Sequence, residues 1–212
     1  GEAKILIGIG LTVTVALIAA ISLFNKPTTS VGGEKVDASA LVREDSPRIE
    51  VADSKVTVVE FLDPECEACG AAYPAVKQVL KDYEGRITFV ARYFPLHNNS
   101  ILAIKSLESA GEQGKYWEMM NKLFTKQTEW AEKQTPQTEF FQRYAQELGL
   151  DMDKFNQGLE NQAFEDKANR DKEDGVSVGV QGTPTFFING VKTGNVLSYE
   201  QFKQKLDAEL AK

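Results

Sequence analysis

The sequence contains few of the residues that cross-link small domains or bind metals: two cysteines and one histidine among 212 residues. Two cysteines are too few for a disulfide-dense scaffold, which needs four or more. A single histidine excludes zinc sites built from two or three histidines. A chain of this length buries a sizeable hydrophobic core without such cross-links.

Positive charge is also scarce, because 24 Lys and Arg residues stand against 31 Asp and Glu residues and give a formal net charge of -7. An acidic chain repels the phosphate backbone, so we expect no nucleic-acid partner. The charges of Glu2 and Lys4 cancel, and residues 25–212 therefore carry all of the net negative charge.

One uncharged apolar stretch, Ile5 to Phe24, is twenty residues long. A helix of that length spans about 30 Å, the thickness of a bilayer's hydrocarbon core, so we expect residues 1–24 to form an N-terminal membrane anchor. A cleaved signal peptide and a buried core helix are the alternatives. Signal peptides have shorter apolar cores, of about 7–15 residues, followed by a small-residue cleavage site that is missing here. Residues 25–47 are rich in Thr, Ser, Gly and acidic residues and predict a linker, made of a flexible tether and an entry segment to the domain.

The domain expected over residues 48–212 opens with a strand, a helix and a second strand. The β-branched run 55–62 predicts the first strand, and residues 86–93 predict the second. Apolar residues at helical spacing run between them, up to Gly85. This order indicates a βαβ unit with a right-handed crossover.

A long helical stretch separates this unit from the last strands. Helical periodicity continues from about residue 99 to residue 178, with Gly and Pro residues between the segments. An Asn-Gly turn then joins predicted strands at 185–188 and 191–193, and a capping box at Ser198 predicts a closing helix over 199–210. The sequence therefore predicts an α/β fold of the order βαβ-ββα, with a helical insertion between its halves.

The two cysteines lie at the start of the first predicted helix, as Cys66-Glu67-Ala68-Cys69. Unpaired N–H groups and the positive dipole end of a helix amino terminus stabilise a thiolate. We expect Cys66 to be the exposed nucleophile and Cys69 to resolve a mixed disulfide. Half of a zinc site and an inert bridge are the alternatives. Zinc takes four ligands and the chain has no second Cys/His pair, so no metal site is expected.

Two further positions deserve a hypothesis. Pro184 opens the strand at 185–188, where proline is tolerated, and a cis Thr183–Pro184 bond would present backbone groups with which an extended peptide can pair. His97 is the sole histidine and lies in a Pro-Leu-His-Asn loop. We interpret His97 as a structural hydrogen-bonding residue, with a catalytic part as the alternative.

Together these motifs resemble the DsbA-like branch of the thioredoxin superfamily, whose membrane-anchored bacterial members are extracytoplasmic thiol:disulfide oxidoreductases. The resemblance covers about residues 45–212. The segments that carry it are 59–69, 93–100, 111–117, 123–124 and 180–190. It implies a thioredoxin fold with a helical insertion.

The resemblance also implies roles for individual residues. It implies that the peptide bond before Pro184 is cis and that Thr183 and Pro184 position the substrate. Glu60 stands at the family's buried acidic position, where a carboxylate can take and return protons during thiol exchange. A simple buried or strand-end acid is the alternative for Glu60. No metal or organic cofactor is implied, because the redox group is the Cys66–Cys69 disulfide itself.

The implied activity is the oxidation of cysteines in reduced exported polypeptides. The implied redox partner is a quinone-linked membrane protein of the DsbB or vitamin-K-epoxide-reductase kind. We expect a membrane-anchored protein whose catalytic domain is extracytoplasmic, in the periplasm or on the outer face of the cell membrane. The alternatives are a reductase or isomerase on the same fold, and a non-enzymatic binding or chaperone module.

The two residues between the cysteines depart from the family's strongly oxidising members, which carry Pro-His there. We treat Glu67 and Ala68 as the redox-tuning pair. An acidic Glu67, with Glu65 and Asp63 nearby, is expected to disfavour the Cys66 thiolate. Because a less stable thiolate makes the disulfide less oxidising, the sequence predicts a milder oxidant than those members.

Overall fold

The computed structural model describes residues 35–194 and 198–212. The expected membrane anchor, residues 1–24, and the first ten residues of the expected linker, 25–34, lie outside the described residues. Within the described part of the chain, no helix is both long enough and apolar enough to cross a membrane.

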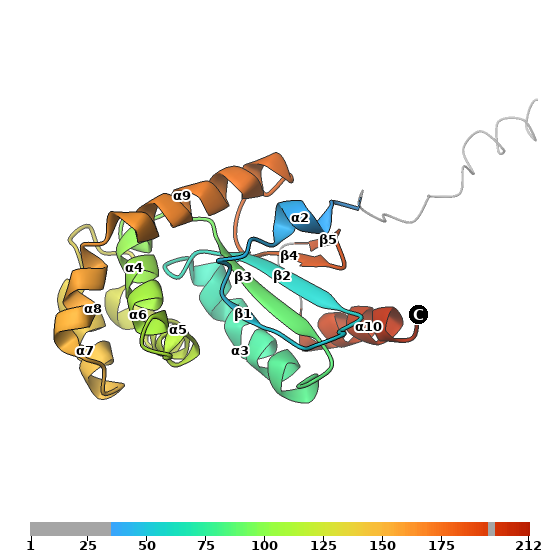
Figure 1. Ribbon diagram of the computed structural model, residues 1–212, viewed down its shortest axis with the longest axis horizontal. Coiled ribbons are helices and arrows are strands. Elements are labelled where there is room, and N and C mark those ends of the chain that lie inside the picture. Colours follow the sequence, from blue (N-terminus) through green and yellow to red (C-terminus); the bar gives the residue numbers. More distant parts are fainter. Residues whose placement is uncertain (1–34, 195–197) are drawn as a thin grey trace, which may run out of the picture. The chain divides into compact units, whose positions relative to one another are not determined.

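A five-stranded mixed sheet lies at the centre of the domain, with the strands in the order β1-β3-β2-β4-β5 (Figure 1). Strands β2 (Thr57–Leu62) and β3 (Thr88–Tyr93) are parallel and are joined by α3 (Glu67–Asp82), which confirms the predicted βαβ unit. Strand β4 (Thr185–Ile188) pairs antiparallel with β2 and with β5 (Val191–Gly194). The Asn-Gly hairpin is therefore also confirmed.

Helices α3 and α10 (Tyr199–Leu210) cover one face of this sheet (Figure 1). Their apolar residues pack against the side chains that β2 and β4 direct to that face, such as Val58 and Phe186. The start of α10 follows the predicted capping box. Ser198 Oγ accepts from Gln201 N, and the Gln201 side chain accepts from Ser198 N at 2.8 Å.

The expected helical insertion is helical in the structure and contributes its own core. Its helices are α4 (Ser100–Gly111), α5 (Tyr116–Thr125), α6 (Gln127–Trp130), α7 (Thr138–Glu147), α8 (Met152–Leu159) and α9 (Gln162–Ser177). Helices α4 to α8 gather at one end of the sheet, and α9 returns along the face opposite α3 (Figure 1). The core of the insertion is continuous with Leu62 and Tyr93 at the ends of β2 and β3, and with Cys69.

Residues 35–47, expected as the end of a flexible linker, pack against the domain instead. Val36 N donates to Gly190 O at 2.8 Å beside β5. A short helix, α2 (Ala38–Leu41), follows and buries Leu41 against the sheet. A strand that the sequence did not predict, β1 (Arg48–Ile49), then pairs antiparallel with β3. These few contacts could not be predicted from the sequence, because they involve isolated residues that form no periodic apolar pattern.

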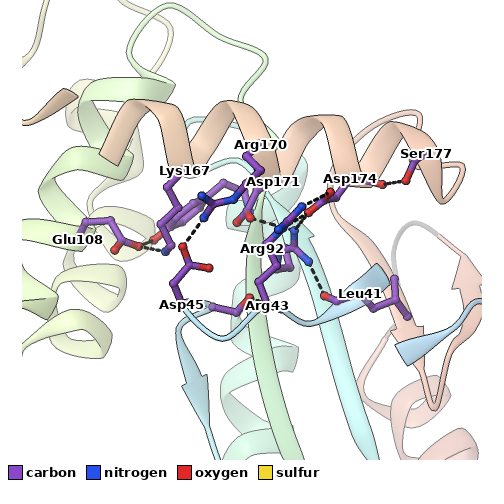
Figure 2. A network of polar contacts seen from close by, with 12 residues as sticks. Leu41, Arg43, Asp45, Arg92, Glu108, Lys167, Arg170, Asp171, Asp174 and Ser177 are labelled. Carbon is purple, nitrogen blue, oxygen red and sulfur yellow. Dashed lines mark hydrogen bonds and ion pairs between the residues drawn. The ribbon is translucent and has the colours of Figure 1, made fainter. Parts of the chain in front are cut away.

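A cluster of charged groups joins this segment to the sheet and to α9 (Figure 2). Arg92 of β3 is fully buried, and its guanidinium donates to Leu41 O at 2.6 Å and to the Asp174 carboxylate. The same guanidinium lies 2.9 Å from the buried Asp171 carboxylate. Arg43 donates to both oxygens of Asp174, at 2.5 and 2.8 Å. A buried arginine needs such partners, since a buried charge left without one costs several kcal/mol.

We predict that Arg92→Met lowers the free energy of unfolding by roughly 3–5 kcal/mol, because it leaves the buried Asp171 carboxylate without its cation. Arg43→Ala is the matched control, since the Arg43 side chain is 40% exposed and a surface ion pair contributes only about 0–1 kcal/mol. Urea denaturation of the full chain measures both losses. Equal losses in the two variants would contradict this account.

Candidate active site

Cys66 is the N-cap residue of α3, in an extended conformation with φ -66° and ψ 122°. Asp63 and Pro64 end β2 in the sequence, and the helix begins at Glu67. Cys69 therefore lies in the first turn of the helix. Cys66 is partly exposed, whereas Cys69 is 1% exposed, and both are free thiols in this structure. The structure thus places one accessible and one buried sulfur at the amino terminus of the same helix.

The environment of Cys66 favours its thiolate. A hydrogen bond from the Cys69 side chain is the largest influence and lowers the pKa of the Cys66 thiol to about 5, against the effect of partial burial. The backbone N–H groups of Cys69 and Ala68 act in the same direction. These donors come from the first turn of α3, as the placement of the motif predicts. Ala68 therefore contributes through its backbone.

Cys69 has the opposite tendency. Burial is the largest influence and raises the pKa of the Cys69 thiol well above its ordinary value, and the charges of Glu60 and Cys66 raise it further. Glu60, on β2, is itself buried, and burial raises the pKa of its carboxyl to about 8. A carboxyl with this pKa exchanges its proton near neutral pH. The structure thus brings Glu60 within electrostatic range of Cys69.

Thr183 and Pro184 lie directly beside the exposed cysteine. The Thr183–Pro184 peptide bond is cis, as the resemblance implied. Cys66 Sγ lies 3.4 Å from Thr183 O and donates to it. The hydroxyl Oγ1 of Thr183 is buried and has no hydrogen-bond partner among the described residues. The loop before β4 therefore contributes one wall of the site, with a backbone carbonyl at the reactive sulfur.

The three acidic residues around Cys66 have different surroundings. Asp63 and Glu65 are buried, and each carboxylate is occupied by hydrogen bonds from elsewhere in the chain. Glu65 Oε2 accepts from Asn99 N at 2.5 Å, and Oε1 accepts from Glu132 N at 3.0 Å. Glu67 is exposed, so solvent screens its charge. The expectation that these three residues disfavour the thiolate stays a prediction.

His97 is held by the Asp63 carboxylate. Its Nδ1 lies 2.6 Å from Asp63 Oδ2, which also accepts from Leu96 N and Ser100 Oγ, each at 2.8 Å. Burial lowers the pKa of His97, but the hydrogen bond and charge of Asp63 outweigh it, so the pKa is raised. The structural hydrogen-bonding interpretation of His97 is confirmed. Because Cys66 also raises this pKa, the ring lies within electrostatic range of the reactive sulfur.

One buried residue at the site, Gln127 of the insertion, was not predicted from the sequence. Its side chain reaches the loop that leads into α3 and donates to Pro64 O and Cys66 O, each at 2.9 Å. These partners lie more than sixty residues away along the chain. Only Gly70, a glycine one position after the motif, hinted at a close approach to the helix.

The described residues contain no group of three or more His, Cys, Asp or Glu side chains arranged to hold a metal ion. The groups of the described site that can exchange electrons or protons at Cys66 and Cys69 are the two thiols and the buried Glu60 carboxyl.

Comparisons with known proteins identify the family and the fold of the chain. A family profile described as thioredoxin matches residues 44–208. Among curated proteins, the Na(+)/H(+) antiporter NhaA 3 of Salinispora tropica is 38% identical over 141 residues, which make up 65% of this chain and 21% of that protein. The chain therefore spans about a fifth of the length of the curated relatives it matches.

Solved structures share the fold. BdbD from Bacillus subtilis, in its oxidised form, has a TM-score of 0.72 and 23% identity, covering 86% of this chain and 98% of that one. The thiol-disulfide exchange protein alpha-DsbA2 from Wolbachia pipientis has a TM-score of 0.70 and 24% identity, covering 81% and 90%. The likeness confirms the predicted βαβ-ββα arrangement with a helical insertion.

We predict that Cys66 titrates with a midpoint near pH 5, measured as thiolate absorbance at 240 nm in the reduced full chain. Cys69→Ala removes the strongest hydrogen-bond donor and should raise this midpoint by about one unit or more. Cys69→Ser is the matched control, because its hydroxyl still donates, and its midpoint should stay closer to that of the wild type. A wild-type midpoint in Cys69→Ala would refute the assignment of this donor.

We predict that Glu60 makes the fold less stable as pH rises. The pKa of Glu60 is about 8 in the folded state, above the ordinary value of 4.5, so the folded protein holds this proton more tightly than the unfolded chain does. The stability that comes from this proton is fully present below pH 4.5 and is lost as pH rises through 8. The free energy of unfolding of the wild type should fall relative to Glu60→Gln by roughly 1 kcal/mol per pH unit across this window. Denaturation of the disulfide form, in which neither thiol titrates, measures the difference. Parallel curves would contradict the prediction.

Proposed function

The chain belongs to the thioredoxin family, and we propose that it is a DsbA-type thiol:disulfide oxidoreductase that forms disulfides in exported proteins. The observation that carries the proposal is the contrast between two thiols one helical turn apart. Cys66 is accessible and has a pKa of about 5, whereas Cys69 is buried and has a raised pKa. One sulfur is therefore suited to form and release mixed disulfides, and the other to resolve them.

In the proposed reaction the oxidised enzyme carries a Cys66–Cys69 disulfide. A substrate thiolate attacks Cys66 Sγ, a mixed disulfide forms, and the Cys66–Cys69 bond breaks with its electron pair on Cys69. Cys69 takes a proton, and Glu60 is the nearby carboxyl with a pKa suited to supply it. A second substrate thiolate then attacks the substrate sulfur of the mixed disulfide and releases the Cys66 thiolate. Substrate loses two electrons, and the enzyme disulfide gains them.

Thr183 and Pro184 are proposed to position the substrate. The support is the Thr183 carbonyl, 3.4 Å from Cys66 Sγ, which places backbone hydrogen-bonding groups beside the sulfur that would carry the mixed disulfide. An extended peptide bound at that edge would bring its cysteine to Cys66.

The direction of transfer follows from the stability of the thiolate. A stabilised Cys66 thiolate favours the reduced enzyme, so its disulfide readily oxidises other thiols. A pKa of about 5 is above the value of about 3.5 for the strongest oxidant of this type, DsbA, so we propose a milder oxidant. The alternative direction, a reductase or isomerase kept reduced by an electron donor, uses the same two thiols.

The proposed setting is the oxidising side of a bacterial membrane, where protein disulfides persist. We propose reduced exported polypeptides as substrates and a quinone-linked membrane protein, of the DsbB or vitamin-K-epoxide-reductase kind, as the reoxidant. The apolar stretch Ile5 to Phe24 supports attachment to a membrane. Antiport is not proposed, because the match to the antiporters covers only 21% of their length.

The activity is tested by mixing the oxidised full chain with a synthetic peptide that contains two reduced cysteines. We predict loss of two peptide thiols per enzyme disulfide, complete loss of activity in Cys66→Ser, and a trapped mixed disulfide at Cys66 in Cys69→Ser. Equilibration with glutathione should give a potential between about -270 mV, the thioredoxin value, and about -120 mV, the DsbA value. A potential near -270 mV would favour the reductase alternative.

The same variants separate the remaining alternatives. A binding or chaperone module would keep its function in Cys66→Ser and would trap no substrates in Cys69→Ser. Expression of Cys69→Ser in cells, followed by identification of the proteins attached to Cys66, tests the partners. Recovery of exported proteins together with a quinone-linked membrane protein supports the proposed setting, whereas recovery of neither contradicts it.

A further inference from the structure

Gln127 connects the helical insertion to the backbone of the reactive cysteine. It is the first residue of α6, it is 9% exposed, and its Nε2 donates to Pro64 O and Cys66 O at 2.9 Å each. Cys66 O also accepts from Gly70 N at 3.1 Å, the first backbone hydrogen bond of α3. One side chain therefore holds the carbonyls on both sides of the turn that enters the helix.

The two acceptors fix the orientation of the Gln127 amide. Both partners are carbonyl oxygens, which accept but do not donate, so the NH₂ group must face them. The reverse orientation would put Oε1 against two carbonyl oxygens and leave both without this donor. The Gln127 amide is thus specific to this position, and a glutamate there would oppose both carbonyls.

Gly70 gives this amide its space. A Cβ built on Gly70 would overlap Gln127 Oε1 and lie 2.9 Å from Gln127 Cδ. A glycine inside a helix destabilises it by roughly 1 kcal/mol relative to alanine. The close approach of the Gln127 side chain to α3 therefore lowers the stability of the helix. The sequence keeps a helix-weakening residue where the Gln127 side chain crosses the helix.

We propose that Gln127 is a positioning residue that holds Cys66 over the amino terminus of α3 and so stabilises the reduced enzyme relative to its disulfide form. The inference deepens the proposed function and rests on it. It makes the helical insertion a determinant of the redox potential, through the Cys66 backbone and without contact to the sulfur.

The effect falls on one redox form because the two forms hold Cys66 differently. In the disulfide form a covalent bond to Cys69 fixes the position of Cys66 Sγ. In the reduced form only hydrogen bonds hold the thiolate, and these come from the Cys69 side chain and from the N–H groups of Ala68 and Cys69. Such bonds weaken steeply with misalignment, so a looser Cys66 backbone costs the reduced form more.

The first test is Gln127→Met, which keeps the side-chain length and removes both hydrogen bonds. The Cys66 midpoint, followed at 240 nm, should rise by about one pH unit. The equilibrium constant for reduction by glutathione should fall about tenfold, which corresponds to a potential about 30 mV lower. A purely structural role would lower the stability of both redox forms equally and would leave midpoint and potential unchanged.

The second test displaces Gln127 from the other side. Gly70→Ala should shift the midpoint and the potential in the same direction as Gln127→Met. The displaced side chain has room to move, because Gln127 lines a cavity of about 300 Å³ with Glu65, Glu67, Thr128 and Glu132. In a Gln127→Ala background the added methyl meets no amide, so Gly70→Ala should cause no further shift and should raise helix stability. Additive shifts from the two substitutions would overturn the proposed contact.

The outcomes separate this inference from the proposed function. Thiolate titration and glutathione equilibration need no protein substrate, so they report on Gln127 even if the dithiol peptide is not oxidised. An active wild type with unchanged midpoints in Gln127→Met and Gly70→Ala would overturn the inference alone. A wild type that fails to oxidise the peptide would overturn the proposed function and leave the measured midpoints as the test of Gln127.

Discussion

Two buried carboxylates hold the loop between β2 and α3, and the geometry of both thiols depends on them. Asp63 accepts from Glu65 N within the loop and from Leu96 N beyond β3. Glu65 accepts from backbone N–H groups of the insertion at Asn99 and Glu132. Since a buried carboxylate is stable only when such donors surround it, loop and insertion fix each other's positions. Cys66 enters the helix from a backbone that is held on both sides.

Because the loop that leads into α3 is held in place, two thiols one helical turn apart have pKa values shifted in opposite directions. The amino terminus of α3 and the Cys69 side chain stabilise charge on Cys66, while burial in the core of the insertion keeps the proton on Cys69. Glu60 is buried within electrostatic range of Cys69, and burial raises the pKa of its carboxyl to about 8. Negative charge is therefore concentrated on Cys66, the sulfur that faces solvent, while the buried Cys69 and Glu60 keep their protons.

Local patterns in the sequence were sufficient for the elements but not for the contacts between them. Apolar β-branched runs identified β2 and β3, an Asn-Gly turn the hairpin and a capping box α10, because each of these signals is complete within a dozen residues. The role of Gln127 rests on partners more than sixty residues away, and the packing of residues 35–47 rests on contacts such as Val36 with Gly190. The Glu65 carboxylate accepts from the N–H groups of Asn99 and Glu132, and neither periodicity nor composition encodes that pairing.

Most of the hydrogen bonds that hold the active-site loop end on a backbone atom. The partners of Glu65 and Gln127 are the N–H groups of Asn99 and Glu132 and the carbonyls of Pro64 and Cys66. A bond to the backbone survives replacement of the partner's side chain, except where proline removes a donor. The surroundings of the loop are therefore free to diverge in sequence while its geometry stays the same. Only a few side chains carry the constraint, and an alternative insertion needs merely to present its amides and carbonyls at the same points.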